Sequence, residues 1–284
     1  MSSQGLATAL VSTVLTLTVS GSAVAATCPP SKYRSARTLI IAHASGSYFG
    51  PPNTIEMMKA AIAAGADILD TDVLSTKDGV LVAAHDDVVR VSKTATVSIS
   101  KTTFKDLEKV DVGETWAGPS GTYPLAGKHV KVPSLESVLT TFPHYRVGIE
   151  LKADGDEATL CTLLRKHKRT DTVFVSSNGD GPVNRFRSLC PEAVTTVTDA
   201  MEAEYQSAHA SGVAWCASVA IGQPPLGFRD FHLTKEDVAW DHAHGLADYT
   251  WVADSKASLQ TVAALGVDAV YTGRAALAKA ILKR

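Results

Sequence analysis

Short apolar runs alternate with helical patterns from residue 37 to residue 273, and this alternation limits the fold more than any other feature. Strand–helix alternation is typical of parallel sheets, because parallel neighbours need a crossover of a dozen or more residues. Eight such units predict an α/β fold of the (β/α)8 TIM-barrel type. A doubly wound open sheet is the alternative, but no Gly-rich dinucleotide loop supports it. The predicted strands are residues 37–43, 66–73, 145–152, 172–177, 193–198, 213–221, 247–253 and 268–273.

One stretch, ADILDTDVLSTKDGVLVAAHDD at residues 66–87, interrupts this alternation. Only TKDGV separates its two apolar runs, which leaves no room for a helix, and Asp-Gly between such runs is a hairpin signal. Residues 80–85 are therefore predicted to fold back antiparallel as a hairpin extension of the second strand. With a two-residue turn centred on Asp78 and Gly79, Asp72 lies opposite His85. Residues 86–132 then elaborate the connection to the third strand.

The first helix after a strand has a recognisable start signal. In NTIEMMKAAIAAG, Asn53 is followed three residues later by Glu56. This arrangement predicts a capping box with Asn53 as the N-cap residue. Gly65 is expected to close the helix.

Residues of catalytic type gather at the ends of three adjacent predicted strands. Side chains alternate along a strand, so residues two apart share a face, and the hairpin adds a histidine to that face. Active sites of barrels form at the C-terminal ends of the strands. We therefore expect one rim to carry His43, Asp70, Asp72, His85, Glu150 and Lys152.

Three converging carboxylates would repel one another without a counter-charge. A hard divalent cation, Mg²⁺ or Ca²⁺, prefers oxygen ligands and resolves this repulsion. We expect Asp70, Asp72 and Glu150 to be its ligands. A phosphate ester suits such a site, and two histidines can divide the work of acid and base.

The chain resembles the glycerophosphodiester phosphodiesterase family over nearly all of residues 27–284. The resemblance rests on IAH with NT ten residues on, LDTDVLSTKDGVLVAAHDD, KVPSLESVL and IELK, and more weakly on GQPPLGF, AHGLADYTWVAD and GVDAVYTGR. It implies a (β/α)8 barrel and metal-dependent hydrolysis of phosphodiesters. It also implies roles for residues: His43 and His85 as the acid–base pair, Lys152 as a phosphate contact, and a metal site at Asp70, Asp72 and Glu150.

The sequence departs from the family pattern at several positions. Ala44 stands where an arginine usually follows the first histidine, and Pro52 where an acidic residue is usual. Asp70 replaces a longer glutamate, which conserves the ligand chemistry. Gly273 stands where an aspartate is usual. Ala44 bears most on function, because an arginine fork would contact phosphate oxygens.

Residues 1–26 contain no charged side chain and combine an apolar stretch with a small-residue end, SAVAA. This pattern predicts a cleaved signal peptide, with an uncleaved anchor as the alternative. Residues 27–284 would then form one secreted, extracytoplasmic domain without a further transmembrane segment. Its four cysteines permit two disulfides in three connectivities, although a buried thiol is also open for Cys216.

These observations predict an exported, metal-dependent phosphodiesterase that hydrolyses glycerophosphodiesters to glycerol phosphate and an alcohol. Two alternatives stay open: a secreted phospholipase D-like enzyme acting on intact lipids, and an inactive barrel that serves as a binding protein. A formal net charge of −2 gives no electrostatic case for a nucleic-acid partner. The expected partner is a small or lipid-derived phosphodiester.

Overall fold

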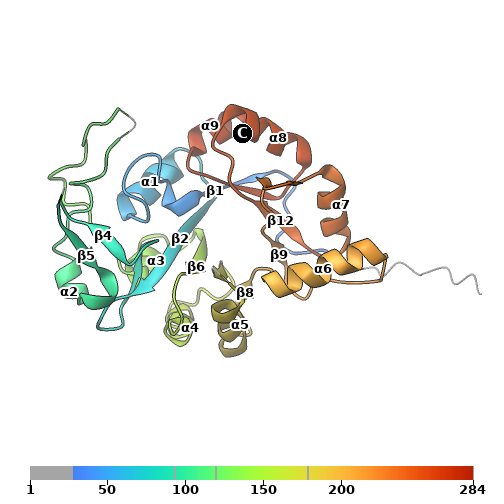
Figure 1. The fold of residues 1–284 in the computed structure, drawn as a ribbon, viewed down its shortest axis with the longest axis horizontal. Helices are drawn as coiled ribbons and strands as arrows, with labels where there is room; N and C mark the ends of the chain where they lie inside the picture. Colours follow the sequence, from blue (N-terminus) through green and yellow to red (C-terminus); the bar gives the residue numbers. More distant parts are fainter. Residues whose placement is uncertain (1–27, 93, 119, 178, 284) are drawn as a thin grey trace, which may run out of the picture.

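A ring of eight parallel strands surrounded by helices forms the centre of the molecule in the computed structural model, which describes residues 28–92, 94–118, 120–177 and 179–283 (Figure 1). Around the ring the order is β8-β7-β6-β2-β1-β13-β12-β9, and a parallel bridge between Thr196 and Ile221 joins its two ends. The predicted (β/α)8 barrel is confirmed. The predicted signal peptide lies outside the described residues. The barrel strands are β1 (Leu39–Ala42), β2 (Ile68–Ser75), β6 (Arg146–Leu151), β7 (Val173–Ser177), β8 (Val194–Thr195), β9 (Ile221–Gly222), β12 (Ala247–Thr250) and β13 (Ala269–Thr272).

Helices follow the barrel strands and cover the outside of the ring. The larger apolar core lies between strands and helices, and a smaller one, which includes Phe174 and Tyr249, fills the barrel interior. None of the helices in the described ranges is long and apolar enough to span a bilayer. The helices are α1 (Ile55–Ala63), α3 (Leu135–Thr141), α4 (Glu157–Lys166), α5 (Asp180–Leu189), α6 (Asp199–Ser211), α7 (Lys235–Ala243), α8 (Lys256–Leu265) and α9 (Ala275–Ile281).

The hairpin extension of β2 is present, but its register differs from the prediction. The strand β3 (Leu81–Ala83) pairs antiparallel with β2, and Ser75 lies opposite Leu81. By this register Asp72 lies opposite Ala84, whose N–H donates to the Asp72 carbonyl, and the prediction that it faces His85 is wrong. The reason is the turn: Thr76 pairs with Val80, which leaves three loop residues that end at Gly79 with a φ of +78°. A three-residue loop with a left-handed glycine shifts the register by one residue.

The chain between β3 and α3 forms a small subdomain beside the barrel (Figure 1). It contains the ribbon β4 (Val88–Arg90) and β5 (Thr96–Ser98), followed by the short helix α2 (Phe104–Leu107). Its own apolar cluster includes Ile99 and Leu107. A second insertion, the ribbon β10 (Gly227–Phe228) and β11 (Phe231–His232), lies between β9 and α7. The first insertion follows the antiparallel extension of β2, and the second follows the C-terminal end of β9.

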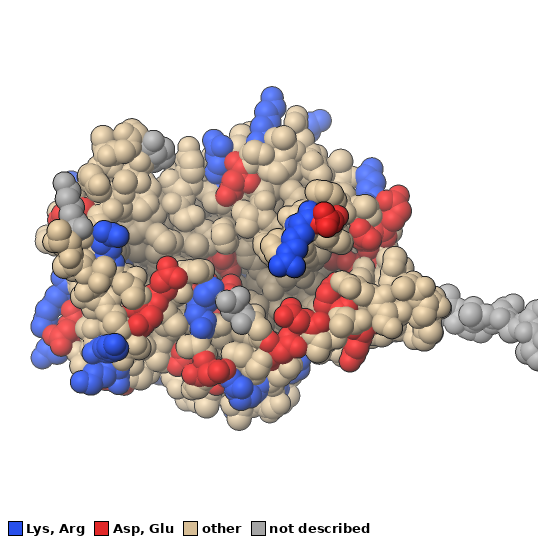
Figure 2. Space-filling view, viewed as in Figure 1, with Lys and Arg blue, Asp and Glu red and all other residues tan. Residues whose placement is uncertain are grey.

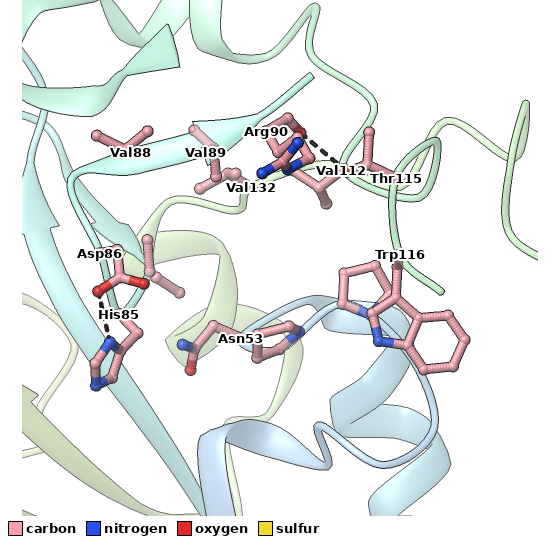
Figure 3. A pocket seen from close by; sticks show the side chains of 14 residues that line it. Asn53, His85, Asp86, Val88, Val89, Arg90, Val112, Thr115, Trp116 and Val132 are labelled. Atoms are coloured by element: carbon pink, nitrogen blue, oxygen red, sulfur yellow. Dashed lines mark hydrogen bonds and ion pairs between the residues drawn. The ribbon is translucent and has the colours of Figure 1, made fainter. Parts of the chain in front are cut away.

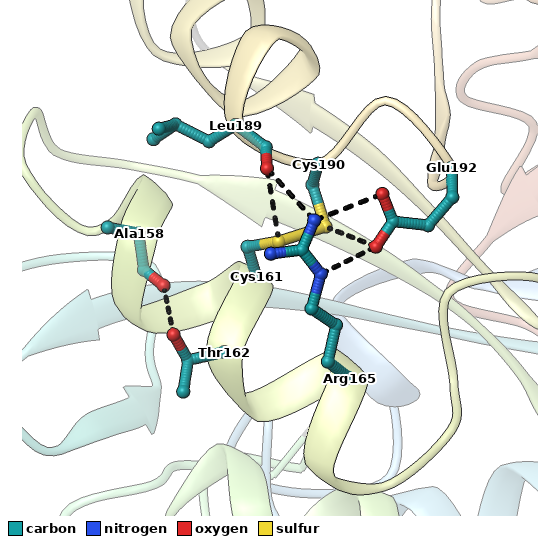
Figure 4. The surroundings of a disulfide bond; sticks show 7 residues. All are labelled: Ala158, Cys161, Thr162, Arg165, Leu189, Cys190 and Glu192. Atoms are coloured by element: carbon teal, nitrogen blue, oxygen red, sulfur yellow. Dashed lines mark hydrogen bonds and ion pairs between the residues drawn. A yellow bond between two sulfur atoms is a disulfide. The ribbon is translucent and has the colours of Figure 1, made fainter.

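All four cysteines form disulfides, and the connectivity left open by the sequence is settled. Cys28 pairs with Cys216 and ties the start of the described chain to the loop before β9. Cys161 of α4 pairs with Cys190 at the end of α5, where Arg165 and Glu192 pair over the bond (Figure 4). The alternative of a buried thiol at Cys216 is therefore wrong. Of the predicted strand 213–221 only Ile221 lies in a strand, β9, because the first part of this stretch belongs to the disulfide-tied loop.

Candidate active site

A polar cavity of about 300 Å³ opens at the C-terminal end of the barrel. His43 at the end of β1, Asp70 of β2 and Glu150 of β6 line this cavity. Three of the six residues that were predicted to lie on one rim therefore line the same cavity. The other lining residues come from four more strand ends: Ser176, Ser177, Gln223, Trp251, Val252 and Tyr271. We call this cavity the barrel mouth.

Asp70 projects into the barrel mouth because its neighbour across the strands is a glycine. Asp70 pairs with Gly148 of β6, and a Cβ on Gly148 would lie 3.2 Å from Asp70 Oδ1 and 2.6 Å from the Phe174 ring. The backbone N–H of Ala44 donates to Asp70 Oδ2 at 3.1 Å. Burial and the charge of Asp72 raise the pKa of Asp70 well above its usual range, and the Ala44 N–H opposes part of that rise.

Asp72, Glu150 and Lys152 form an ion-pair network at the same end of the barrel. Asp72 and Glu150 are register partners on β2 and β6. The Lys152 ammonium lies 2.8 Å from Glu150 Oε1 and 3.5 Å from Asp72 Oδ1, and its side chain is 11% exposed. Burial disfavours this ammonium, but the hydrogen bond and charge of Glu150 and the charge of Asp72 outweigh it and raise the pKa of Lys152. Lys152 therefore stays charged and balances one of the carboxylates.

Asn53 belongs to this network, a role that its sequence pattern does not predict. The N-cap of α1 is Thr54, so the predicted capping role of Asn53 is wrong. Asn53 takes a φ of +62° and turns its amide into the barrel end, where Nδ2 donates to Asp72 Oδ2 at 2.9 Å. Its Oδ1 accepts from the Thr71 hydroxyl and the Asp72 N–H. The residue type was the one available signal for this conformation, because asparagine is enriched among residues with a positive φ.

His43 begins a short helical turn whose next two residues have unusual backbone angles. Ala44 and Ser45 have φ values of +45° and +58°, a conformation that non-glycine residues seldom adopt. This turn directs the Ala44 N–H at Asp70, and the Ser45 hydroxyl donates to the Asp70 carbonyl. The His43 ring lies edge-on to Tyr271, with 6.3 Å between centroids. Strained backbone of this kind is common at functional sites.

His85 lies outside the barrel mouth. Its ring is 56% exposed, and Nδ1 pairs with Asp86 at 2.9 Å. It borders a neighbouring cavity of about 300 Å³, the side cavity, whose wall is largely apolar and includes Val88, Val112 and Trp116 (Figure 3). Asn53, whose amide donates to Asp72, also lines this side cavity. The one-residue change of register accounts for the position of His85.

The donor set suits a hard divalent cation in chemistry and charge. Three carboxylates face a single ammonium, and each ligand offers oxygen. The oxygens of Asp70, Asp72 and Glu150 do not lie close enough together to surround one ion. Among the described residues, one group of three metal-type ligands has its atoms within 4.8 Å of one another, and it contains the disulfide pair Cys161 and Cys190. The cation therefore stays a prediction.

A (β/α)8 barrel with an imidazole, carboxylates and an ammonium at its C-terminal end is the architecture of a barrel hydrolase. Comparison with known proteins assigns this barrel to the enzymes that act on phosphoric diesters. The model of the glycerophosphoryl diester phosphodiesterase family matches residues 43–277. The chain belongs to this family. A glycerophosphodiester phosphodiesterase of Bacillus subtilis is 27% identical over 253 residues, which cover 83% of either chain.

Solved structures share the fold. The glycerophosphoryl diester phosphodiesterase domain of a Mycobacterium tuberculosis protein superposes with a TM-score of 0.75 at 16% identity, over 86% of this chain and 98% of that one. A phosphodiesterase of Oleispira antarctica, solved with its product sn-glycerol-3-phosphate, has a TM-score of 0.66 at 18% identity, over 87% and 98% of the two chains. At these identities the likeness extends to the fold alone.

Proposed function

We propose that this protein is an exported glycerophosphodiester phosphodiesterase that depends on a divalent cation and releases glycerol phosphate and an alcohol. The observation that carries this proposal is the barrel mouth, where His43, Asp70 and Glu150 line one cavity and Glu150 pairs with the ammonium of Lys152. Family membership supports the reaction class. The product of the Oleispira enzyme is the product expected here.

The residues of the mouth divide the work by their chemistry. Lys152 supplies a permanent positive charge beside the place where a phosphate would lie, and it is held by two carboxylates. His43 carries an imidazole that can take a proton from water or give one to a leaving oxygen. His85 would be the second proton-transfer group, acting from the side cavity. Asp86 orients its ring.

Asp70, Asp72 and Glu150 would hold the cation. A bound Mg²⁺ or Ca²⁺ would supply charge that stabilises the phosphoryl oxygens as negative charge builds on them. The excess of carboxylates over ammonium groups at this end of the barrel supports the proposal. The hydrogen bonds from Ala44 to Asp70 and from Asn53 to Asp72 would fix the orientation of these two ligands.

Export is supported by the disulfides and by the amino-terminal sequence. Two disulfides that use all four cysteines suit an oxidising compartment. Cys28 lies two residues beyond the expected cleavage region, so the cross-link to Cys216 survives removal of residues 1–26. Intact-mass analysis of the secreted protein, with and without reductant, tests both parts. A retained residue 1 with four free thiols would exclude export.

One observation favours a lipid substrate as a second candidate. The side cavity beside His85 is lined by Val88, Val89, Val112, Val132 and Trp116. The apolar acylglycerol portion of a lysophospholipid would bury there better than the polar glycerol of a small diester. This candidate shares the mouth, its chemistry and the departing head-group alcohol, and differs in the acyl chain on the portion that stays bonded to phosphate.

Phosphorus NMR tests the two candidates together. Protein loaded with Mg²⁺ or Ca²⁺ is incubated with glycerophosphocholine, lysophosphatidylcholine or sphingomyelin, and a matched sample contains excess chelator. The proposal expects glycerol phosphate from the first substrate and no turnover with chelator. Faster turnover of the lipids, with or without a cyclic phosphate product, would favour the second candidate. Absence of turnover on all three would leave a barrel that only binds, and full activity with chelator would exclude metal dependence.

A further inference from the structure

A diester in the barrel mouth is an anion, and the wall of the mouth offers it little positive charge. Among the described residues that line the mouth, none is a lysine or an arginine, whereas Asp70 and Glu150 bring carboxylates. Lys152 does not line the mouth, because Glu150 and Asp72 hold its ammonium at the same end of the barrel. Apart from the imidazole of His43, the lining side chains that can contact a phosphoryl oxygen are therefore neutral hydrogen-bond donors.

The rest of the molecule does not supply the missing positive charge. Basic and acidic side chains are interspersed over the face seen in Figure 2, and the formal net charge of the chain is −2. Ala44 stands where an arginine is usual in the family, so the charged fork that would contact two phosphate oxygens is missing as well. Recognition of the phosphate group must then come from donors inside the mouth.

Two of the donor side chains in the mouth are already used within the protein. The Ser177 hydroxyl donates to a backbone carbonyl two residues on, at 2.5 Å. The indole N–H of Trp251 donates to the Gln223 carbonyl at 2.7 Å. The side chains of Gln223 and Tyr271 remain, together with the hydroxyl of Ser176.

Gln223 and Tyr271 bond to each other and still have hydrogens to donate. The Gln223 side-chain amide donates to the Tyr271 hydroxyl at 2.5 Å. A glutamine amide carries two N–H hydrogens and a tyrosine one O–H hydrogen, so this bond uses one of three. Burial and the charge of Asp70 raise the pKa of Tyr271 well above its usual range, so the hydroxyl keeps its hydrogen near neutral pH. Within the described chain neither side chain makes a second hydrogen bond, and both line the mouth.

The surrounding structure fixes the position of this pair. Tyr271 belongs to β13, is 5% exposed and lies edge-on to the ring of His43. Gln223 follows β9, and its carbonyl is held by the indole of Trp251. The Leu226 N–H donates to the Trp251 carbonyl at 2.7 Å, which fastens the segment after Gln223 to the end of β12. Donors that are held in place before binding lose little conformational freedom when a ligand arrives.

We propose that Tyr271 and Gln223 bind a phosphoryl oxygen of the diester in the barrel mouth and take the place of the arginine that is usual at the position of Ala44. The Tyr271 hydroxyl contacts the oxygen, and the Gln223 amide contacts it and also holds the hydroxyl. The inference rests on the proposed function for the identity of its ligand. Binding of the product anion tests it without any turnover.

Calorimetric titration of the full protein with sn-glycerol-3-phosphate, in buffer that contains Mg²⁺, provides that test. Tyr271→Phe and Gln223→Leu should each weaken binding about tenfold, because each removes donors to a charged acceptor. Gln223→Glu should weaken binding further, since its carboxylate repels the anion. No binding by the wild type, or wild-type affinity in Tyr271→Phe and Gln223→Leu, would overturn the proposal.

Tyr249→Phe is the matched control for Tyr271→Phe. Tyr249 lies in the neighbouring strand β12, is fully buried and does not line the mouth. Its hydroxyl accepts from Arg146 at 3.2 Å, at the start of β6, so phenylalanine there also removes a buried hydroxyl that has a partner. Circular dichroism checks that each variant is folded. A purely structural role for the pair predicts that all three variants, with Gln223→Leu, lose thermal stability while affinity for sn-glycerol-3-phosphate stays unchanged, and that result would refute the proposal.

Kinetics with glycerophosphocholine separate this inference from the proposed function. A contact made alike in the bound substrate and in the transition state raises KM, so Tyr271→Phe and Gln223→Leu should raise KM about tenfold with kcat nearly unchanged. A fall in kcat at constant KM would show that the pair does not bind the substrate. Unchanged kinetics in both variants of an active enzyme would refute the pair and leave the proposed function standing. Weakened binding of sn-glycerol-3-phosphate in variants of a protein that hydrolyses no diester would refute the proposed function and leave the pair as an anion site.

Discussion

Replacement of Asn53 by alanine should destabilise the protein strongly, although the sequence alone marks Asn53 only as a helix cap. The Asn53 side chain is buried, with the residue 1% exposed, and makes three hydrogen bonds, at 2.9 Å to Asp72 Oδ2, 3.0 Å from Thr71 and 3.3 Å from the Asp72 N–H. The bond to the charged Asp72 contributes roughly 2 kcal/mol and the two neutral ones about 1 kcal/mol each. Alanine at a φ of +62° adds about 1 kcal/mol of backbone strain. Because such terms are not fully additive, we expect a loss of about 4 kcal/mol in the free energy of unfolding.

A second variant separates the hydrogen bonds from the backbone strain. Asn53→Gly also removes the three hydrogen bonds but tolerates the positive φ, so it should be about 1 kcal/mol more stable than Asn53→Ala. Urea unfolding with both disulfides intact, followed by tryptophan fluorescence, measures both values. If Asn53→Ala lies within about 1 kcal/mol of wild type, Asn53 does not hold Asp72 and the reasoning is refuted. If glycine is the less stable of the two, the strain argument is wrong.

Three further predictions concern catalysis and pH. His43→Ala and His85→Ala should each reduce kcat about a hundredfold or more with metal affinity retained, and a wild-type rate in either variant would remove that histidine from the mechanism. Ala44→Arg should lower KM for glycerophosphodiesters, since a guanidinium can contact two phosphate oxygens, and a rise in KM would mean that the pocket is built around alanine. Burial raises the pKa of Asp241 from 3.8 to about 6, so the free energy of unfolding of the wild type should decline as pH rises from about 4 to 6. Asp241→Asn should flatten that decline and be more stable than wild type by at most about 3 kcal/mol at pH 7, as measured by urea unfolding.

The register of the hairpin is a structural feature that the sequence pattern did not predict correctly. Asp-Gly between two apolar runs was sufficient to predict the antiparallel fold-back. It could not distinguish a two-residue turn from the three-residue loop that ends at Gly79, because both accept the same residues. The difference of one residue moves His85 from the carboxylate face to the side cavity. Its assigned role as an acid or base therefore depends on the side cavity and awaits the kinetic test.

The sequence by itself determined the strand–helix alternation, and with it the barrel, because periodicity and crossover length are local properties. It also determined that His43, Asp70 and Glu150 would meet, since strand ends of a parallel barrel share one rim. Only the tertiary structure decided the disulfide partners, the left-handed turn at Asn53 that bonds Asp72, and the buried pair of Asp241 and Asp248 between helix and strand. These features join residues far apart in the chain, and whether such residues touch depends on how the elements pack in three dimensions, which no local pattern encodes.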